Sequence, residues 1–304
     1  MSFLDSLRNL FKVPPAPARP YHGLREHTVQ CLGPHGLHRM AYTEWGDPKN
    51  PRVLVCAHGL TRNGRDFDDL ARALADHYRV ICPDVVGRGR SDWLGVKADY
   101  GFPLYVADMI TLIARLDVES VHWFGTSMGG LIGMLIASQP HSPIKRLVLN
   151  DVGPVVTAVS LRRIGQYVGT APRFSTMADA EAYIRMVSAP FGPLTDAQWR
   201  HLTEYTVRPV EGGFAMVYDP GIGDVFRNAP ILVDVDWWDT YDRIRCPTLA
   251  LRGAESDLLE HETLVAMSKR GPKAGIVEFP GVGHAPMMMD EGQIAVVREF
   301  LLEA

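Results

Sequence analysis

A serine between two glycines gives the sequence its strongest chemical signal. Residues 125–129 read Gly-Thr-Ser-Met-Gly, between an apolar stretch at 121–124 and another at 128–139. Their lengths predict a buried strand followed by a helix. A tight strand-to-helix turn exposes a serine hydroxyl and directs helix N–H groups toward it. Side chains at 125 and 129 would clash in such a turn, so glycine suits both positions. Ser127 is therefore the candidate nucleophile.

The candidate base is His284. A serine hydroxyl is a weak nucleophile at neutral pH and needs a base to take its proton. His284 lies in the glycine-rich segment 281–286, after the last predicted strand and near the C-terminus. When the nucleophile sits on a turn of this kind, the base comes last in chain order. We expect His284 to activate Ser127.

A carboxylate must orient this base, and three residues are candidates for that role. Asp257 follows a predicted strand at 248–252 and is the preferred acid. Glu255 is two residues away and could serve if the loop has another shape. Asp151 follows an earlier predicted strand and is the second alternative, although a turn-stabilising role is favoured for it.

Two backbone N–H groups are expected to bind the oxyanion of a tetrahedral intermediate. One belongs to Met128, the residue after the nucleophile. The other belongs to Leu60, in the His-Gly-Leu-Thr loop at 58–61 that follows an apolar strand at 53–57. His58 is expected to hold this loop through hydrogen bonds rather than act as a second base.

Short apolar strands alternate with amphipathic stretches along most of the chain, which predicts helices packed on a mostly parallel sheet. The first strands are expected at 26–32 and 37–44. The core is predicted to comprise residues 23–153 and 241–304, and residues 154–240 are predicted to form a helical cap insertion. Residues 1–22 are read as an amphipathic segment followed by a proline-rich linker.

Composition excludes several classes of partner. The net charge of −4 and the absence of a Lys/Arg cluster argue against nucleic acid. No stretch is long and apolar enough to span a membrane, so no stable membrane insertion is expected. The four cysteines, Cys31, Cys56, Cys82 and Cys246, form no zinc-type spacing. No metal or organic cofactor is expected, because the serine mechanism needs neither. Cys56 and Cys82 are predicted to be buried reduced thiols, which favours a cytoplasmic protein.

These motifs together resemble the α/β-hydrolase superfamily from about residue 35 onward. The resemblance rests on His58-Gly59, on Gly-Arg-Gly-Arg-Ser-Asp at 87–92, on the Ser127 turn, and on Asp257 and His284. It implies an eight-stranded, mostly parallel sheet with helices on both faces and an inserted helical cap. A serine rather than an aspartate at the turn implies acyl-enzyme chemistry. Two features depart from the family pattern: an acid loop one residue longer, and the proline-rich N-terminus.

The resulting hypothesis is a serine esterase that forms an acyl-enzyme on Ser127. Its expected substrates are neutral small-molecule esters of short to medium chain length. The resemblance adds polyester oligomers, which related capped enzymes accept, although no residue of this sequence indicates them by itself. Trp93, Trp237 and Trp238 are predicted to line the substrate pocket. The alternatives are a carbon–carbon bond hydrolase of the meta-cleavage type, an acyltransferase, and a non-catalytic ligand receptor. A homo-oligomer is compatible with the sequence.

Overall fold

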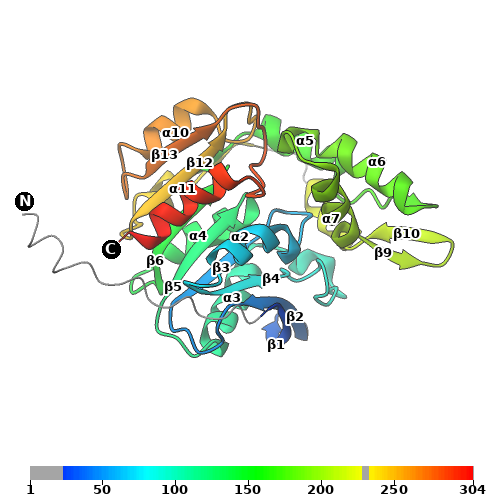
Figure 1. Cartoon of the computed structure of the whole chain (residues 1–304), viewed down its shortest axis with the longest axis horizontal. Helices are drawn as coiled ribbons and strands as arrows, with labels where there is room; N and C mark the ends of the chain where they lie inside the picture. The colour runs from blue at the N-terminus through cyan, green and yellow to red at the C-terminus, as the bar shows by residue number, and fades with distance from the viewer. Residues whose placement is uncertain (1–22, 228–232, 304) are drawn as a thin grey trace, which may run out of the picture.

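An eight-stranded sheet forms the centre of the molecule (Figure 1). The computed structural model describes residues 23–227 and 233–303, so the predicted N-terminal segment 1–22 lies outside the described residues. The strands are β1 (Arg25–Gly33), β2 (Gly36–Trp45), β3 (Val53–Ala57), β4 (Arg79–Pro83), β5 (Val121–Thr126), β6 (Ile144–Asn150), β12 (Thr248–Gly253) and β13 (Gly275–Phe279).

The strand order is β1-β2-β4-β3-β5-β6-β12-β13. Strand β2 is antiparallel to both β1 and β4, and all other neighbours in the sheet are parallel. The carboxyl ends of the parallel strands therefore meet at one edge, where α/β sheets bind their ligands. This architecture confirms the predicted fold class.

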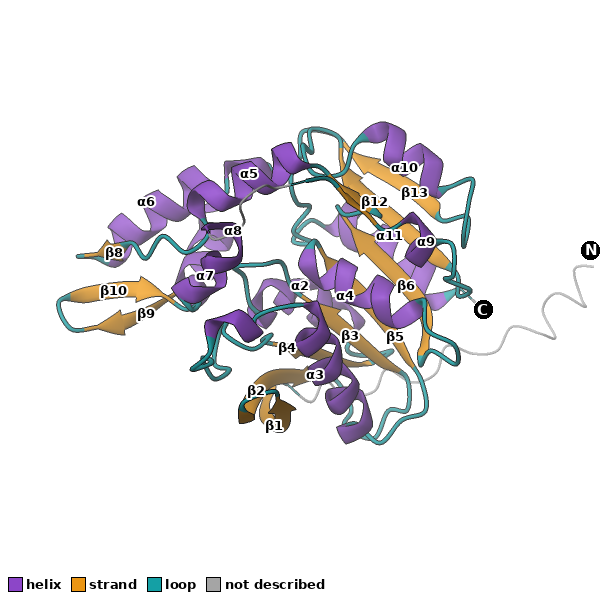
Figure 2. Cartoon of the chain, turned by 180° about the vertical axis from the view of Figure 1, so that it is seen from behind, coloured by secondary structure: helices purple, strands orange, loops and turns teal. Residues whose placement is uncertain are grey.

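Helices cover both faces of the sheet, as Figures 1 and 2 show. Strand β3 shows why, because Val53 and Val55 enter one apolar cluster while Leu54 and Cys56 enter the other. Helices α3 (Phe102–Arg115), α4 (Met128–Ala137), α9 (Trp238–Tyr241) and α10 (His261–Met267) pack in the first cluster. Helices α2 (Asp68–Leu74) and α11 (Glu291–Leu302) pack in the second. The short 3-10 turns η1 (Gly64–Phe67) and η2 (Lys97–Asp99) lie in loops.

The chain leaves the sheet after β6 and returns to it at β12, and the residues between form a layer beside the sheet (Figure 1). Two short strands at the base of this insertion pair antiparallel, Val155 with Asp236 and Val156 with Val235. The elements of the insertion are β7 (Val155–Val156), α5 (Ala158–Tyr167), β8 (Arg173–Phe174), α6 (Met177–Val187), η3 (Ala189–Phe191), α7 (Asp196–Thr206), β9 (Val207–Val210), β10 (Gly213–Met216), η4 (Pro220–Gly223), α8 (Asp224–Arg227) and β11 (Val235–Asp236).

The insertion is not wholly helical, which corrects the sequence expectation. Strands β8, β10 and β9 form a three-stranded antiparallel sheet. Strands β9 and β10 are joined by Glu211 and Gly212, and Gly212 has a positive φ of 78° that glycine tolerates well. Each strand has four residues or fewer, and Pro209 lies inside β9, so no period-two pattern was visible.

Two expectations from composition can be compared with the described residues. None of the helices in this part of the chain is long and apolar enough to cross a membrane. The four cysteines are free, and Cys56 and Cys82 are buried as predicted. The cytoplasmic location itself stays a prediction.

Candidate active site

Three side chains form a continuous hydrogen-bonded chain at the carboxyl edge of the sheet. The Nε2 atom of His284 lies 3.0 Å from Ser127 Oγ, and its Nδ1 atom lies 2.6 Å from Asp151 Oδ2. The carboxylate can only accept, so the imidazole donates from Nδ1 and Nε2 is free to accept the serine proton. Ser127 follows β5, Asp151 follows β6 and His284 follows β13. This geometry brings a nucleophile, a base and an orienting acid into contact.

The structure places Asp151, rather than Asp257, against His284. The Asp257 carboxylate instead pairs with Arg163, with 2.6 Å between Asp257 Oδ2 and Arg163 Nε. The Asp257 side chain is also 56% exposed, whereas the Asp151 side chain is fully buried. The preference for Asp257 as the partner of His284 is therefore wrong, and the alternative Asp151 is the residue in contact. Glu255 lines the same cavity, but the Nδ1 atom of His284 bonds to Asp151.

The loop after β12, which was expected to supply the acid, instead supplies hydrogen-bond donors to Asp151. The backbone N–H of Gly253 donates to Asp151 Oδ1 at 2.8 Å, and the Ser256 hydroxyl donates to Oδ2 at 2.6 Å. Together with His284, these donors replace the water that a buried carboxylate loses. Ser256 was not singled out from the sequence, because its role depends on a contact across 105 residues.

Asn150 links the nucleophile turn to the loop that carries the base. Its backbone carbonyl accepts from Ser127 N–H at 3.0 Å. Its side-chain Nδ2 donates to Thr126 Oγ1 at 3.0 Å and to the Pro286 carbonyl at 2.8 Å. The relative position of Ser127 and His284 therefore depends on one amide that sequence reasoning missed.

The turn at Ser127 has the strained geometry that the glycines predicted. Ser127 has φ 52° and ψ −117°, outside the common regions for a residue with a side chain. A Cβ atom at Gly125 would lie 2.3 Å from the Gly129 carbonyl oxygen. A Cβ atom at Gly129 would lie 2.0 Å from the Ala57 carbonyl oxygen. Backbone rather than flexible side chain blocks both positions, so neither glycine can be replaced without moving the turn.

The loop at residues 58–61 lies beside this turn, and His58 supports it as expected. His58 Nδ1 donates to the Gly59 carbonyl at 2.7 Å, and Nε2 accepts from Val85 N–H at 2.9 Å. Complete burial lowers the pKa of His58 to about 3, so the ring is neutral at working pH. The His58 carbonyl also accepts from Gly129 N–H at 3.1 Å, which joins the loop to the first turn of α4.

Arg88 also holds the loop at residues 58–61 through hydrogen bonds, a role that the sequence did not reveal. Its side chain is fully buried, and its Nε donates to the Leu60 carbonyl at 2.8 Å. Its NH1 group donates to the Val86 carbonyl at 2.7 Å and to the Tyr105 hydroxyl at 3.0 Å. The guanidinium therefore fixes the carbonyl of the residue expected to supply an oxyanion donor.

A cavity of about 400 Å³ opens over Ser127 and His284, between the sheet edge and the insertion. Its apolar wall comes mainly from the insertion, with Ile164, Tyr167, Tyr183, Ile184, Val187, Phe191, Met216 and Tyr218 among the lining residues. Leu60 lines it as well, whereas Met128 is buried as the first residue of α4. The volume suits a small organic ligand.

None of the three tryptophans predicted for the pocket lines this cavity. Trp93 is 40% exposed and lies under the Arg208 guanidinium, 5.0 Å from ring centroid to Cζ. Trp237 packs edge-on against Phe102, and Trp238 packs against Tyr241. The expectation is corrected because Trp237 and Trp238, where the chain rejoins the core, pack against the core cluster instead of the cavity.

The chain belongs to the α/β-hydrolase family, since the family's model matches residues 54–298. It is 52% identical over 284 residues to the 3-hydroxybutyrate-oligomer hydrolase of Cupriavidus necator, covering 91% of this chain and 97% of that protein. The site and this relative identify the chain as a carboxylic ester hydrolase.

Solved structures agree with the family assignment. An α/β-hydrolase of Novosphingobium aromaticivorans superposes with a TM-score of 0.81 at 35% identity, covering 91% of this chain and 98% of that one. A Rickettsia typhi protein superposes with a TM-score of 0.85 at 32% identity, covering 92% and 98%. In both cases the overlap includes the insertion as well as the sheet, because so little of either chain is left out.

Replacing each candidate acid separately tests which one serves the base. We expect Asp151→Asn to lower kcat by about 10³–10⁴-fold, because the amide cannot stabilise the imidazolium and favours the wrong tautomer. Asp257→Asn is the matched control and is expected to change kcat less than about 10-fold, since its carboxylate contacts Arg163 instead. The measurement is steady-state hydrolysis of p-nitrophenyl butyrate. The reverse ranking of the two variants would contradict the assignment.

The neutral buried ring of His58 predicts a pH dependence of stability. Below pH 6.5 the unfolded chain binds a proton at His58, but the folded chain does not until about pH 3. The free energy of unfolding therefore decreases as the pH is lowered through this window. At pH 5 this effect amounts to about 2 kcal/mol. His58→Asn removes it, so the stability advantage of the wild type over the variant should shrink by about that amount between pH 7 and pH 5.

Urea unfolding of both proteins at the two pH values measures this change. His141→Asn, at an exposed position, is the matched control and should leave the pH dependence unaltered. If the wild type keeps the same stability advantage over His58→Asn at both pH values, the His58 ring titrates alike in the folded and unfolded chains.

Proposed function

We propose that this ester hydrolase acts through an acyl-enzyme on Ser127. The observation that carries the proposal is the hydrogen-bonded chain from Asp151 through His284 to Ser127. His284 takes the serine proton as Oγ attacks the ester carbonyl, and then delivers it to the leaving alkoxide. Water, deprotonated by the same imidazole, attacks the acyl-enzyme and releases the acid. Asp151 stabilises the imidazolium in both steps.

The oxyanion of each tetrahedral intermediate binds to the N–H groups of Leu60 and Met128. Met128 begins α4, so its N–H has no partner within the helix and lies at the positive end of the helix dipole. The hydrogen bond between the His58 carbonyl and Gly129 N–H supports this role, because it holds the Leu60 loop against that helix end. Arg88 limits the movement of Leu60 further.

The substrates that we propose are short oligoesters of 3-hydroxybutyrate. Support comes from the Cupriavidus necator relative, whose coverage spans nearly the full length of both chains. The cavity is compatible with such a chain, because its wall is largely apolar but includes the charged residues Arg62, Asp66, Arg163, Glu255 and Asp257. This proposal departs from the sequence expectation of neutral esters, since an oligomer carries a free carboxylate at one end.

Arg163 is the group best placed to recognise that carboxylate. It lines the cavity from α5, and its side chain is 37% exposed. Its guanidinium hydrogen-bonds to Asp257, another cavity residue, from NH2 at 3.0 Å. A planar guanidinium suits bidentate carboxylate binding, so the substrate can share or displace Asp257.

Arg62, the other arginine of the cavity, is already fully engaged. Its Nε and NH2 groups donate to Asp66 at 2.8 and 2.6 Å, and its NH1 group donates to Thr206 Oγ1 at 2.8 Å. These contacts join the loop after β3 to helix α7 of the insertion. Arg62 therefore positions the insertion over the site rather than binding substrate.

Ser127→Ala tests the chemistry. We expect wild type to release p-nitrophenol from the butyrate ester and the variant to be slower by about 10⁴-fold or more, because the nucleophilic oxygen is gone. Mass spectrometry of the wild type, quenched during turnover, should show an acyl adduct on Ser127. A well-folded variant with near wild-type turnover would remove Ser127 from the mechanism. Absence of ester turnover in the wild type, with turnover of a dienone, would support the carbon–carbon hydrolase alternative.

Arg163→Gln tests the substrate class. Loss of a charge-assisted contact should raise KM for linear 3-hydroxybutyrate trimer by about 5–30-fold, with kcat little changed. The methyl ester of the same trimer has no terminal carboxylate, so its KM should stay within about twofold. Asp257→Asn is the opposing control and should lower KM for the free acid, because it removes the competing carboxylate. Equal effects on acid and methyl ester would exclude carboxylate recognition by Arg163.

A further inference from the structure

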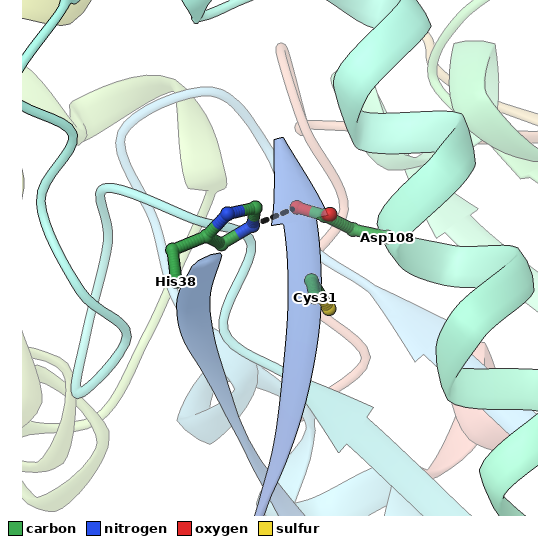
Figure 3. Close-up of side chains that lie close together, drawn as sticks. All are labelled: Cys31, His38 and Asp108. Carbon is green, nitrogen blue, oxygen red and sulfur yellow. Dashed lines mark hydrogen bonds and ion pairs between the residues drawn. The ribbon is translucent and has the colours of Figure 1, made fainter. Parts of the chain in front are cut away.

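A second cluster of reactive side chains lies at the far edge of the sheet (Figure 3). It comprises Cys31 from β1, His38 from β2 and Asp108 from α3, and their ligand-type atoms all lie within 4.8 Å of one another. His38 Nε2 is 2.9 Å from Asp108 Oδ2. Figure 3 shows His38 and Asp108 pointing toward one another, with Cys31 beside them on the neighbouring strand. The mechanism at Ser127 uses none of them.

The polar atoms of this cluster are buried and incompletely paired. The side chains of His38 and Asp108 are 4% and 1% exposed. Within the described part of the chain, Asp108 Oδ1 and His38 Nδ1 have no hydrogen-bond partner. An unpaired carboxylate oxygen in the interior is costly, and such groups often mark a missing ion or water.

The Cys31 thiol and the Asp108 carboxylate are two acidic groups that lie side by side in the interior. Burial and the neighbouring carboxylate raise the pKa of the Cys31 thiol to about 12, and burial raises the pKa of Asp108. A thiol with so high a pKa is a poor nucleophile, which argues against a second catalytic site. A divalent cation would satisfy the thiolate and the carboxylate at once.

We propose that Cys31, His38 and Asp108 bind a zinc ion, at a site that is independent of the esterase activity. Sulfur, imidazole nitrogen and carboxylate oxygen are the ligands that zinc prefers. Bonds of about 2.0–2.3 Å in a tetrahedron put ligand atoms about 3.3–3.8 Å apart. The His38–Asp108 pair, at 2.9 Å, is slightly closer than that, and no pair exceeds 4.8 Å. Shifts of less than about 1 Å would complete the site.

Binding has a defined proton balance. His38 coordinates through Nε2, so its ring proton moves to Nδ1, and the hydrogen bond to Asp108 is replaced by two bonds to the metal. The Cys31 thiol releases its proton to solvent and binds as thiolate. A water molecule completes the fourth position, as is usual when zinc has three protein ligands.

A second cavity lies beside the cluster. Its volume is about 350 Å³, and it is lined by His38 together with Gly33, Gly36 and Leu37 of the β1–β2 hairpin. The loop residues Asp92, Trp93 and Asp99 form its other side. Because His38 belongs both to this cavity and to the buried cluster, we expect a metal ion to approach the ligands from this side.

The position of the site indicates a structural role. It links the terminal hairpin to α3, whereas Ser127 follows β5, the fifth strand in the sheet order. With neighbouring strands about 4.8 Å apart, the two sites are separated by roughly 15–20 Å. Zinc should therefore stabilise the fold without entering the reaction.

Zinc and cobalt binding to the purified full chain test the proposal. After removal of metals with a chelator and dialysis, the wild type should rebind one zinc per chain and unfold at a higher temperature, with kcat unchanged. Cobalt(II) should give a thiolate-to-metal charge-transfer absorption. Cys31→Ser and Asp108→Asn should lose that absorption and the thermal shift. Cys56→Ser, at an equally buried thiol outside the cluster, should keep both.

X-ray absorption at the zinc edge of the loaded wild type needs no variant and so remains decisive if the variants fold poorly. We expect one sulfur at about 2.3 Å and the remaining ligands nitrogen or oxygen. A shell without sulfur, no zinc retention, or equal cobalt spectra in wild type and Cys31→Ser would overturn the proposal. Zinc that inhibits hydrolysis without raising the unfolding temperature would place the ion on His284 instead.

Discussion

The buried carboxylate of Asp151 is the interaction on which the site depends. It receives hydrogen bonds from Gly253, Ser256 and His284, which belong to segments far apart in the chain. A fully buried charge is tolerated only when such donors replace its lost hydration. The requirement to satisfy this one group therefore fixes the loop after β12 and the loop after β13 relative to β6. Catalytic alignment and local stability have the same physical origin here.

The loop that we propose to supply an oxyanion donor shows the same principle with cations and neutral groups. Arg88 is buried at the centre of the loop at 87–92 and directs its guanidinium to carbonyl oxygens rather than to an acid. His58 stays neutral because burial disfavours its charged form, and both ring nitrogens are used. Neither residue reaches the reacting atoms, yet both limit how far Leu60 can move. A precise backbone donor therefore requires buried polar support behind it.

The sequence was sufficient for features that depend on local pattern. The alternation of strands and helices, the glycines around Ser127 and the position of His284 all follow from spacing along the chain, and the structure agrees with each. The acid of the site could not be chosen from the sequence, because several carboxylates follow strand ends. Only the three-dimensional path of the loop at 253–257 decides which carboxylate reaches His284. Asp151 follows β6 directly, whereas Asp257 lies four residues beyond β12. The shorter connection holds its side chain more rigidly at the sheet edge.

Features that depend on tertiary contact left no readable pattern. Trp93, Trp237 and Trp238 were assigned to the pocket by residue type, but packing against Arg208, Phe102 and Tyr241 directs them elsewhere. The zinc-type cluster escaped notice for a related reason, since a hairpin and a helix about 70 residues away supply its ligands.

Two of the buried aspartates of this chain, Asp151 and Asp108, allow a direct contrast. Asp151 has a donor for each oxygen, and its environment is complete without any ion. Asp108 is equally buried, but one of its oxygens lacks a donor within the described residues, and its neighbours are a thiol and an imidazole. Burial alone would make both sites equally unfavourable for charge, so the difference lies in the donors. The protein supplies hydrogen-bond donors to the first carboxylate, whereas the second lies among the side chains that we propose as zinc ligands.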